Sequence, residues 1–159
     1  AMPQERPNGH RIKQLHILAR QRMGGTLEQL ELTPAQSHVL HYLVEHRAQC
    51  PGPRDVEEFF SLTHPTVSGI LSRLEAKGFV SFRTDRADRR CKRIHVSEKA
   101  LTCDGQIHDY IEALEKQMVQ DFTPEEQAQF SSLLDRAIQN LGGEPGIFHK
   151  LHKKEDALL

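Results

Sequence analysis

The chain has 159 residues, and its 21 Lys and Arg nearly balance its 22 Asp and Glu, leaving a formal net charge of −1. No run of about 18 apolar residues occurs and the N-terminus lacks the apolar stretch of a secretory signal, so we expect no membrane span and a cytoplasmic location. Three cysteines without Cys-x-x-Cys spacing argue against a disulfide framework and a zinc ribbon. A chain of this size buries about 70% of its unfolded surface, which predicts one domain over residues 1–159.

The charge is distributed unevenly along the chain. Residues 83–93 hold six Lys and Arg against two Asp, whereas residues 98–136 hold nine Asp and Glu against three Lys and Arg. A protein with a local basic surface can bind a polyanion with one face even when its total charge is near zero. The near-neutral total therefore does not exclude nucleic acid as a partner.

Two helices are predicted in the first third of the chain. The first covers residues 9–31, where the glycine pair at 24–25 is expected to weaken or bend it. The second begins after Thr33, which can cap it, with Pro34 at a position that suits proline and Gln36 completing a capping box. The apolar positions with helical spacing are Ile12, Leu15, Ala19, Met23, Val39, Leu40, Leu43 and Val44.

Residues 54–77 are predicted to form two short helices joined by a turn, in which Thr63 caps the second helix. The second helix has one apolar and one polar face. Small and polar side chains together with an arginine suit close approach to the major groove of DNA, although an ordinary solvated face has the same composition. The core-facing positions are Val67, Ile70, Leu71 and Leu74, and the outward positions are Thr66, Gly69, Ser72 and Arg73.

Residues 79–83 and 93–97 alternate between apolar and polar side chains, which predicts a β-hairpin. The connection over residues 84–92 is too long for a tight turn and is rich in arginine, so we expect it to protrude as a wing. Arg86 is assigned to its tip, and Arg89 or Arg90 is expected to form the ion pair with Asp85 or Asp88. The alternative is a solvated turn whose charges keep an exposed strand edge from aggregating.

Two further helices are predicted over residues 98–142. The first runs from Glu98 to about Phe122, which is close to 37 Å and too long for a compact monomer to cover. The second begins after Thr123 with a second capping box, and residues 143–159 are expected to form a short helix or a loose tail. The apolar stripe of these helices suits a partner or the core of one chain: Leu101, Ile107, Ile111, Leu114, Met118, Val119, Phe130, Leu133, Leu134, Ala137, Ile138 and Leu141.

The segment from Thr66 to Val80 and the motif Asp85-x-x-Asp88-Arg89-Arg90 resemble the recognition helix and wing of the multiple-antibiotic-resistance regulator (MarR) family of bacterial transcription factors. The sequence from Leu32 to Gln36 is similar to the start of the family's second helix, and the resemblance covers most of the chain. Two positions depart from the family pattern, with Ala87 where an arginine is usual and Ala100 where a glycine is usual. The wing-tip contacts and the start of the following helix are therefore expected to differ in detail.

The resemblance implies a mainly α fold with a small β-hairpin (α+β). Residues 33–97 would form a winged helix-turn-helix DNA-binding lobe, and residues 9–31 and 98–142 a helical dimerisation lobe. The implied protein is a homodimeric repressor without a cofactor that binds a pseudo-palindromic operator in double-stranded DNA, with its recognition helices about 34 to 36 Å apart. The predicted DNA-binding residues are Thr63, His64, Pro65, Thr66, Ser68, Gly69, Ser72, Arg73, Arg83, Arg86, Arg89 and Arg90.

Three hypotheses address what controls such a regulator. The family resemblance implies a small aromatic or phenolic ligand between the two lobes, for which His16, His38 and Tyr42 are candidate lining residues, with core or surface roles as the alternative. Metal sensing is suggested by the pairs His38-x-x-His41 and His149-x-x-His152, although no Cys or carboxylate completes a set. Oxidation sensing would use Cys91, whose pKa the neighbouring arginines are expected to lower, against the alternative of an inert exposed thiol.

Two other classes of function are alternatives to DNA binding. An enzyme is not expected, because the sequence contains no recognisable nucleophile elbow, phosphate loop or pair of catalytic carboxylates. A winged-helix module that binds only protein is the second alternative, since a fold does not fix its function. Six cations within eleven residues favour DNA over a protein partner.

Overall fold

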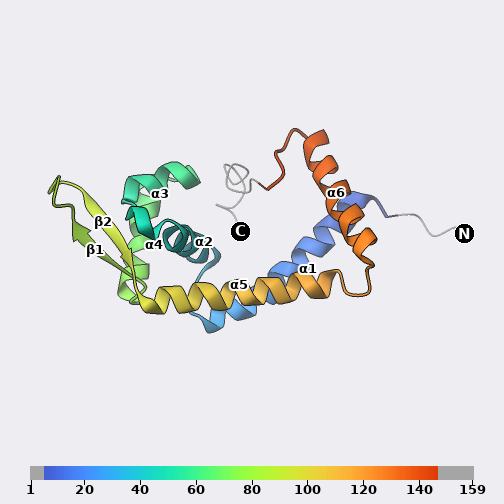
Figure 1. Cartoon of the computed structure of the whole chain (residues 1–159), viewed down its shortest axis with the longest axis horizontal. Helices are drawn as coiled ribbons and strands as arrows, with labels where there is room; N and C mark the ends of the chain where they lie inside the picture. The colour runs from blue at the N-terminus through green and yellow to red at the C-terminus, as the bar shows by residue number, and fades with distance from the viewer. Residues whose placement is uncertain (1–5, 147–159) are drawn as a thin grey trace, which may run out of the picture.

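The computed structural model describes residues 6–146 and shows an elongated molecule built from helices and one β-hairpin (Figure 1). The hairpin and α2–α4 lie at one end, α5 runs along the length of the molecule with α1 beside it, and α6 lies at the other end. The elements are α1 (Asn8–Gln29), α2 (Pro34–Glu45), the 3-10 turn η1 (Arg47–Gln49), α3 (Pro53–Phe60), α4 (His64–Ala76), β1 (Val80–Thr84), β2 (Lys92–Val96), α5 (Glu98–Met118) and α6 (Pro124–Asn140).

The two predicted capping boxes are confirmed. The Thr33 hydroxyl accepts from the backbone N–H of Gln36 at 3.2 Å, and the Gln36 side chain accepts from the N–H of Thr33 at 3.3 Å. Thr123 and Glu126 make the same pair of bonds at the start of α6, at 3.1 and 2.9 Å. Thr63 is the N-cap residue of α4 as predicted, but its hydroxyl bonds to the Thr66 hydroxyl at 2.9 Å and makes no capping bond to a backbone N–H.

Helix α1 passes through the glycine pair at 24–25 without interruption. Contacts with α5 hold the turn before the glycines, since the Tyr110 hydroxyl donates to the Arg22 carbonyl at 3.0 Å and the Arg22 guanidinium donates to the Gln117 side chain. Helix α5 ends at Met118, short of the expected Phe122. The chain must leave the helix there because Thr123 needs extended backbone to cap α6, and Asp121 with φ +68° makes the turn.

The hydrophobic core joins α2, α3, α4, the hairpin and the first turns of α5. Its most deeply buried side chains are Val39, Leu40, Leu43, Val56, Val67, Leu71, Leu74, Phe79, Ile94 and Ala100. The strands pair antiparallel, from Val80 opposite Val96 to Thr84 opposite Lys92, which confirms the predicted hairpin. The N–H of Ile94 donates to the Pro51 carbonyl at 2.9 Å, so the segment after α2 is bonded to β2.

One polar contact ties the helix-turn-helix to the long helix. His41 of α2 places Nδ1 3.1 and 3.3 Å from the two carboxylate oxygens of Asp104 on α5, and its Nε2 lies 3.3 Å from Glu45. Asp104 is buried, so this carboxylate relies on the imidazole to replace lost water.

We expect Asp104→Ala to lower the free energy of unfolding by about 1 to 2 kcal/mol, because it removes a mostly buried hydrogen-bonding partner of His41. Asp109→Ala, an exposed carboxylate on the same helix, is the matched control and should change stability by less than about 0.5 kcal/mol. Urea unfolding at one fixed protein concentration measures both. Equal stability of the two variants would mean that the His41–Asp104 contact contributes nothing.

Candidate nucleic-acid interface

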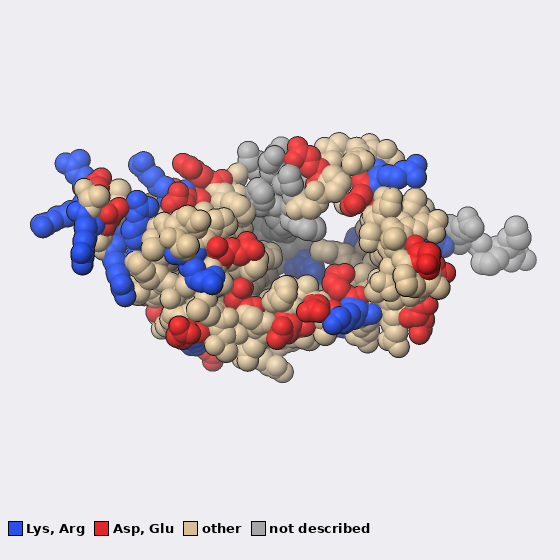
Figure 2. Space-filling view, in the orientation of Figure 1, with Lys and Arg blue, Asp and Glu red and all other residues tan. Residues whose placement is uncertain are grey.

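The twelve predicted DNA-binding residues all lie on the surface, on the turn before α4, on α4 and on the hairpin with its loop. Lys and Arg side chains gather at the hairpin end of the molecule, whereas Asp and Glu follow α5 and surround α6 (Figure 2). The charge asymmetry read along the sequence is thus also a separation in space. The basic end is the candidate interface.

Helix α4 has one buried and one exposed face, as predicted. Val67, Ile70, Leu71 and Leu74 are buried, and Thr66, Gly69, Ser72 and Arg73 are exposed. A Cβ at Gly69 would meet no atom of the chain within 4 Å, so nothing in the protein's own packing requires glycine there. Glycine in a helix costs roughly 0.5–1 kcal/mol relative to alanine, and at position 69 it leaves the outward face of α4 without a side chain.

The first residue of α4 is held by α3. Nδ1 of His64 lies 2.6 Å from a carboxylate oxygen of Glu57, across the turn that joins the two helices. The His64 side chain is 75% exposed and that of Glu57 only 20%. The imidazole is therefore presented to solvent from a fixed carboxylate anchor.

The two aspartates of the loop hold its shape. Asp85 accepts from the backbone N–H of Ala87 at 2.9 Å and pairs with the Arg93 guanidinium at 3.0 Å, and these contacts hold the pKa of its carboxyl below the usual value. Asp88 accepts from the backbone N–H of Arg90 at 3.0 Å. The expected ion pair of Arg89 or Arg90 with these aspartates is wrong, because the Asp85 partner is Arg93 on β2 and Asp88 binds the backbone of Arg90.

This arrangement leaves the arginines of the interface unengaged. Among residues 6–146, no hydrogen bond or ion pair holds the guanidinium groups of Arg73, Arg83, Arg86, Arg89 and Arg90. Unpaired exposed guanidinium groups are the donors that phosphate oxygens and guanine edges accept. The geometry thus offers a cationic surface next to a helix with small outward side chains.

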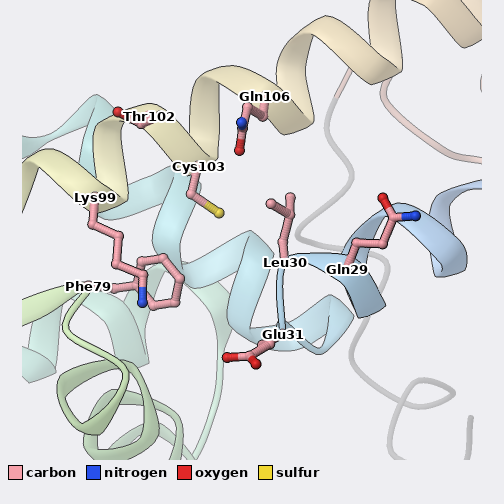
Figure 3. A pocket seen from close by; sticks show the side chains of 8 residues that line it. All are labelled: Gln29, Leu30, Glu31, Phe79, Lys99, Thr102, Cys103 and Gln106. Carbon is pink, nitrogen blue, oxygen red and sulfur yellow. The ribbon is translucent and has the colours of Figure 1, made fainter.

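The end of α4 is tied to both neighbouring helices. Nζ of Lys77 donates to the Glu31 carbonyl and, at 3.0 Å, to the Gln36 side chain, while Nζ of Lys99 donates to the Lys77 carbonyl at 2.6 Å. Lys99 also lies 4.5 Å from the centroid of the Phe79 ring. Beside this junction is an open pocket of about 370 Å³ (Figure 3). Its lining residues are Gln29, Leu30, Glu31, Phe79, Lys99, Thr102, Cys103 and Gln106.

The three candidate ligand residues do not line this pocket. His16 is exposed on α1 and His38 is exposed on α2. Tyr42 is buried in a cluster of rings, with centroids 4.2 Å from His46, 4.5 Å from Phe59 and 5.8 Å from Phe60. Burial and the charges of Asp55 and Glu58 raise the pKa of its hydroxyl.

The histidine pairs show no ligand set within the described part of the chain. His41 uses its two ring nitrogens for Asp104 and Glu45, which lie on opposite sides of the ring. No group of three or more His, Cys, Asp or Glu side chains in residues 6–146 is arranged to hold a metal ion. The second pair, His149 and His152, lies outside the described residues.

The oxidation-sensing hypothesis requires a lowered pKa at Cys91, but the structure raises this pKa and favours the alternative of an inert exposed thiol. Its thiol donates to the Asp88 carboxylate at 3.5 Å, and this bond and the negative charge of Asp88 raise the pKa, outweighing the opposite effect of Arg93. The nearest charge, not the excess of arginines in the loop, decides the sign. Cys91 is exposed but is held in the less reactive thiol form.

Asp88→Ala should therefore accelerate alkylation of Cys91 by iodoacetamide at neutral pH, because losing the carboxylate lowers the pKa of the thiol and raises its thiolate fraction. Peptide-resolved mass spectrometry measures the rate. Cys50, whose thiol bonds to the Arg47 carbonyl, is the internal reference. An unchanged ratio of the Cys91 and Cys50 rates would show that Asp88 does not control this thiol.

Three contacts of this region were not predicted: Glu57 with His64, Asp85 with Arg93, and Lys77 with Gln36. The strand register contains a signal for the second, because pairing Thr84 with Lys92 brings residues 85 and 93 close together. The other two depend on the angle between helices, for which residue spacing gives no signal.

Known proteins resemble this chain over a range that includes the candidate interface. A family model described as MarR family matches residues 30–90. A point mutant of S. aureus MepR bound to an oligodeoxyribonucleotide is 26% identical with a TM-score of 0.70, over 86% of this chain and 99% of that one. S. aureus MepR bound to ethidium bromide is 25% identical with a TM-score of 0.69, over 86% and 98%.

A putative MarR family transcriptional regulator from Clostridium acetobutylicum is 22% identical with a TM-score of 0.72, over 84% of this chain and 98% of that one. The solved structures match both the winged region and the long helices, and this chain shares their winged-helix fold. Within residues 6–146 no helix combines the length and the apolar character needed to cross a membrane.

Proposed function

We propose that this chain is a member of the MarR family, and that it is a homodimeric regulator of transcription that binds double-stranded DNA. The observation that carries the proposal is the pairing of an outward α4 face with unengaged arginines on the adjacent hairpin (Figure 2). In the proposed complex α4 enters the major groove, and the loop between the strands reaches the flanking minor groove.

Two features of the interface support DNA over a protein partner. The loop aspartates are occupied by the loop itself, so the charge presented outward is positive. Flexible guanidinium groups on an exposed loop are suited to phosphates, which set the position of a protein on the duplex, whereas the small side chains of α4 permit contact with base edges. The similarity of this chain to a mutant of S. aureus MepR bound to an oligodeoxyribonucleotide also supports DNA as the partner.

A second copy of the chain is proposed to cover α1, α5 and α6. Helix α6 contains no buried residue, and the three helices and the residues that flank α6 expose several large apolar side chains. The exposed residues are Ile12, Leu15, Ile17, Leu18, Ile111, Phe122, Leu133, Ile138 and Leu141. Residues 9–31 and 98–142 would thus form the dimerisation lobe and residues 33–97 the DNA-binding lobe. Ile107 is excluded from the interface, because it is buried in the core of its own chain.

Leu133→Glu should convert the dimer to a monomer, because a carboxylate at a side chain that is 51% exposed in the single chain would be buried without a partner in the dimer. Gln139→Glu introduces the same charge on the side of α6 that faces away from the centre of its apolar stripe and should leave the dimer intact. Light scattering after gel filtration gives the mass of each variant. A dimeric Leu133→Glu protein, or a monomeric parent, would contradict the proposed interface.

The proposed dimer acts as a repressor at a pseudo-palindromic operator, with half-sites about one helical turn apart. Release by a small aromatic ligand is part of the proposal, with His16, His38 and Tyr42 as the candidate residues on α1 and α2. Ethidium bromide, an aromatic cation, is bound by S. aureus MepR, which supports this class of ligand.

The function is tested by selecting DNA fragments bound by the protein from a bacterial genome and titrating the best one at two salt concentrations. If the dimer neutralises about 6 to 10 phosphates, its affinity should fall by roughly 10³ to 10⁵ between 50 and 200 mM salt. Affinity without salt dependence, or no enrichment of any fragment, would favour the alternative of a winged-helix module that binds only protein.

In the same assay Arg73→Ala should weaken operator binding by about 1 to 3 kcal/mol, because Arg73 lies on the outward face of α4 without a partner within the described residues. Arg136→Ala, an exposed arginine of α6 far from the hairpin, removes the same charge and should have little effect. Equal affinity of the two variants would remove Arg73 from the interface.

A further inference from the structure

The contact between Glu57 and His64 has a chemical consequence for the candidate interface. Nδ1 of His64 lies 2.6 Å from a carboxylate oxygen of Glu57. Because a carboxylate only accepts hydrogen bonds, Nδ1 carries the proton of this bond. In the neutral ring Nε2 is then without a proton and acts as an acceptor. Within the described residues no group bonds to Nε2, and the side chain is 75% exposed.

The position of His64 places this acceptor where it can contact the edge of a base. It is the first residue of α4, and the N-terminal residues of a recognition helix are those that contact base edges. The hydrogen-bond donors that bases expose in the major groove are the amino groups of adenine and cytosine. An acceptor at Nε2 therefore distinguishes these two bases from guanine and thymine at the position it faces.

We propose that Glu57 is a positioning residue that fixes His64 as a hydrogen-bond acceptor and so makes His64 select adenine or cytosine at one position of each half-site. This inference rests on the proposed DNA binding. Glu57 acts through His64, because its own carboxylate is largely covered by the protein.

A purely structural or electrostatic role for Glu57 predicts a different result. Loss of a negative charge near DNA tightens binding to every sequence alike, since it reduces repulsion of phosphates. The proposed role instead changes which base is preferred at a single position. Glu58, the next residue of α3, is exposed and carries the same charge without a bond to α4, so Glu58→Ala is the matched control for charge alone.

The test is selection from a randomised double-stranded DNA library by the full-length protein and by His64→Ala, Glu57→Ala and Glu58→Ala, at a pH of about 8, where an ordinary imidazole is neutral. The parent protein and Glu58→Ala should prefer adenine or cytosine at one position by about 2- to 12-fold, the range of a single hydrogen bond. His64→Ala should lose this preference at that position alone. Glu57→Ala should lose it or shift it toward guanine and thymine, because a released ring can present Nε2–H.

The tautomer is read separately by ¹⁵N NMR of the His64 ring in the absence of DNA. Nε2 should be unprotonated in the parent protein and should gain a proton in Glu57→Ala. The preference of the double variant Glu57→Ala/His64→Ala should equal that of His64→Ala, since Glu57 acts only through the imidazole.

The inference is overturned by any of three results: a protonated Nε2 in the neutral parent ring, an unchanged base preference in Glu57→Ala, or an effect of Glu57→Ala that persists without His64. Failure of the proposed function looks different. In that case the parent protein enriches no sequence, whereas the NMR measurement still reports the Nδ1–H tautomer set by Glu57.

Discussion

The rotation of α4 about its own axis is set by four apolar side chains, and the candidate interface depends on it. Val67, Ile70, Leu71 and Leu74 recur at the spacing of one helical face and are buried against the core. Burial of that face removes any freedom to turn Arg73 or Gly69 inward. Packing thus decides which residues meet solvent before any contact with a partner is considered.

The ends of α4 are fixed by polar contacts with the neighbouring elements. At its start Glu57 of α3 holds His64, and at its end Lys77 reaches the first turn of α2 while Lys99 of α5 reaches the Lys77 carbonyl. The Ser97 hydroxyl adds a bond to the Gly78 carbonyl at 2.8 Å. These bonds join the end of α4 to α2 and α5. The His41–Asp104 contact joins α2 to α5 in the same way.

The parts of this fold that were predictable are those in which the interacting residues are neighbours in sequence. Thr33 with Gln36 and Thr123 with Glu126 are three residues apart, so the capping boxes follow from local geometry. The stripe of α4 follows in the same way from helical periodicity. The predicted ion-pair partner of Asp85 was wrong, because strand register brings Arg93 to this carboxylate. Proximity along the loop sequence had favoured Arg89 or Arg90.

Other errors came from competition between a local preference and the surroundings. Thr63 has the right position and backbone for a cap, yet its hydroxyl finds the Thr66 hydroxyl instead of a backbone N–H. The pKa of Cys91 depends on one carboxylate 3.5 Å away, which composition alone would assign to the arginines around it.

A chain with a net charge of −1 still has a cationic surface, because Lys and Arg gather at the hairpin whereas Asp and Glu predominate along α5 and around α6 (Figure 2). Asp85 and Asp88 accept hydrogen bonds from backbone N–H groups, and Asp85 also pairs with Arg93. They shape the basic end without forming ion pairs with the outward arginines. The carboxylates along α5 and around α6 lie away from that end (Figure 2). A polyanion is then attracted by the hairpin and repelled by the far helices, which orients its approach as well as strengthening it. The same separation leaves the apolar faces of α1, α5 and α6 clear of nucleic acid, where a second copy of the chain can cover them.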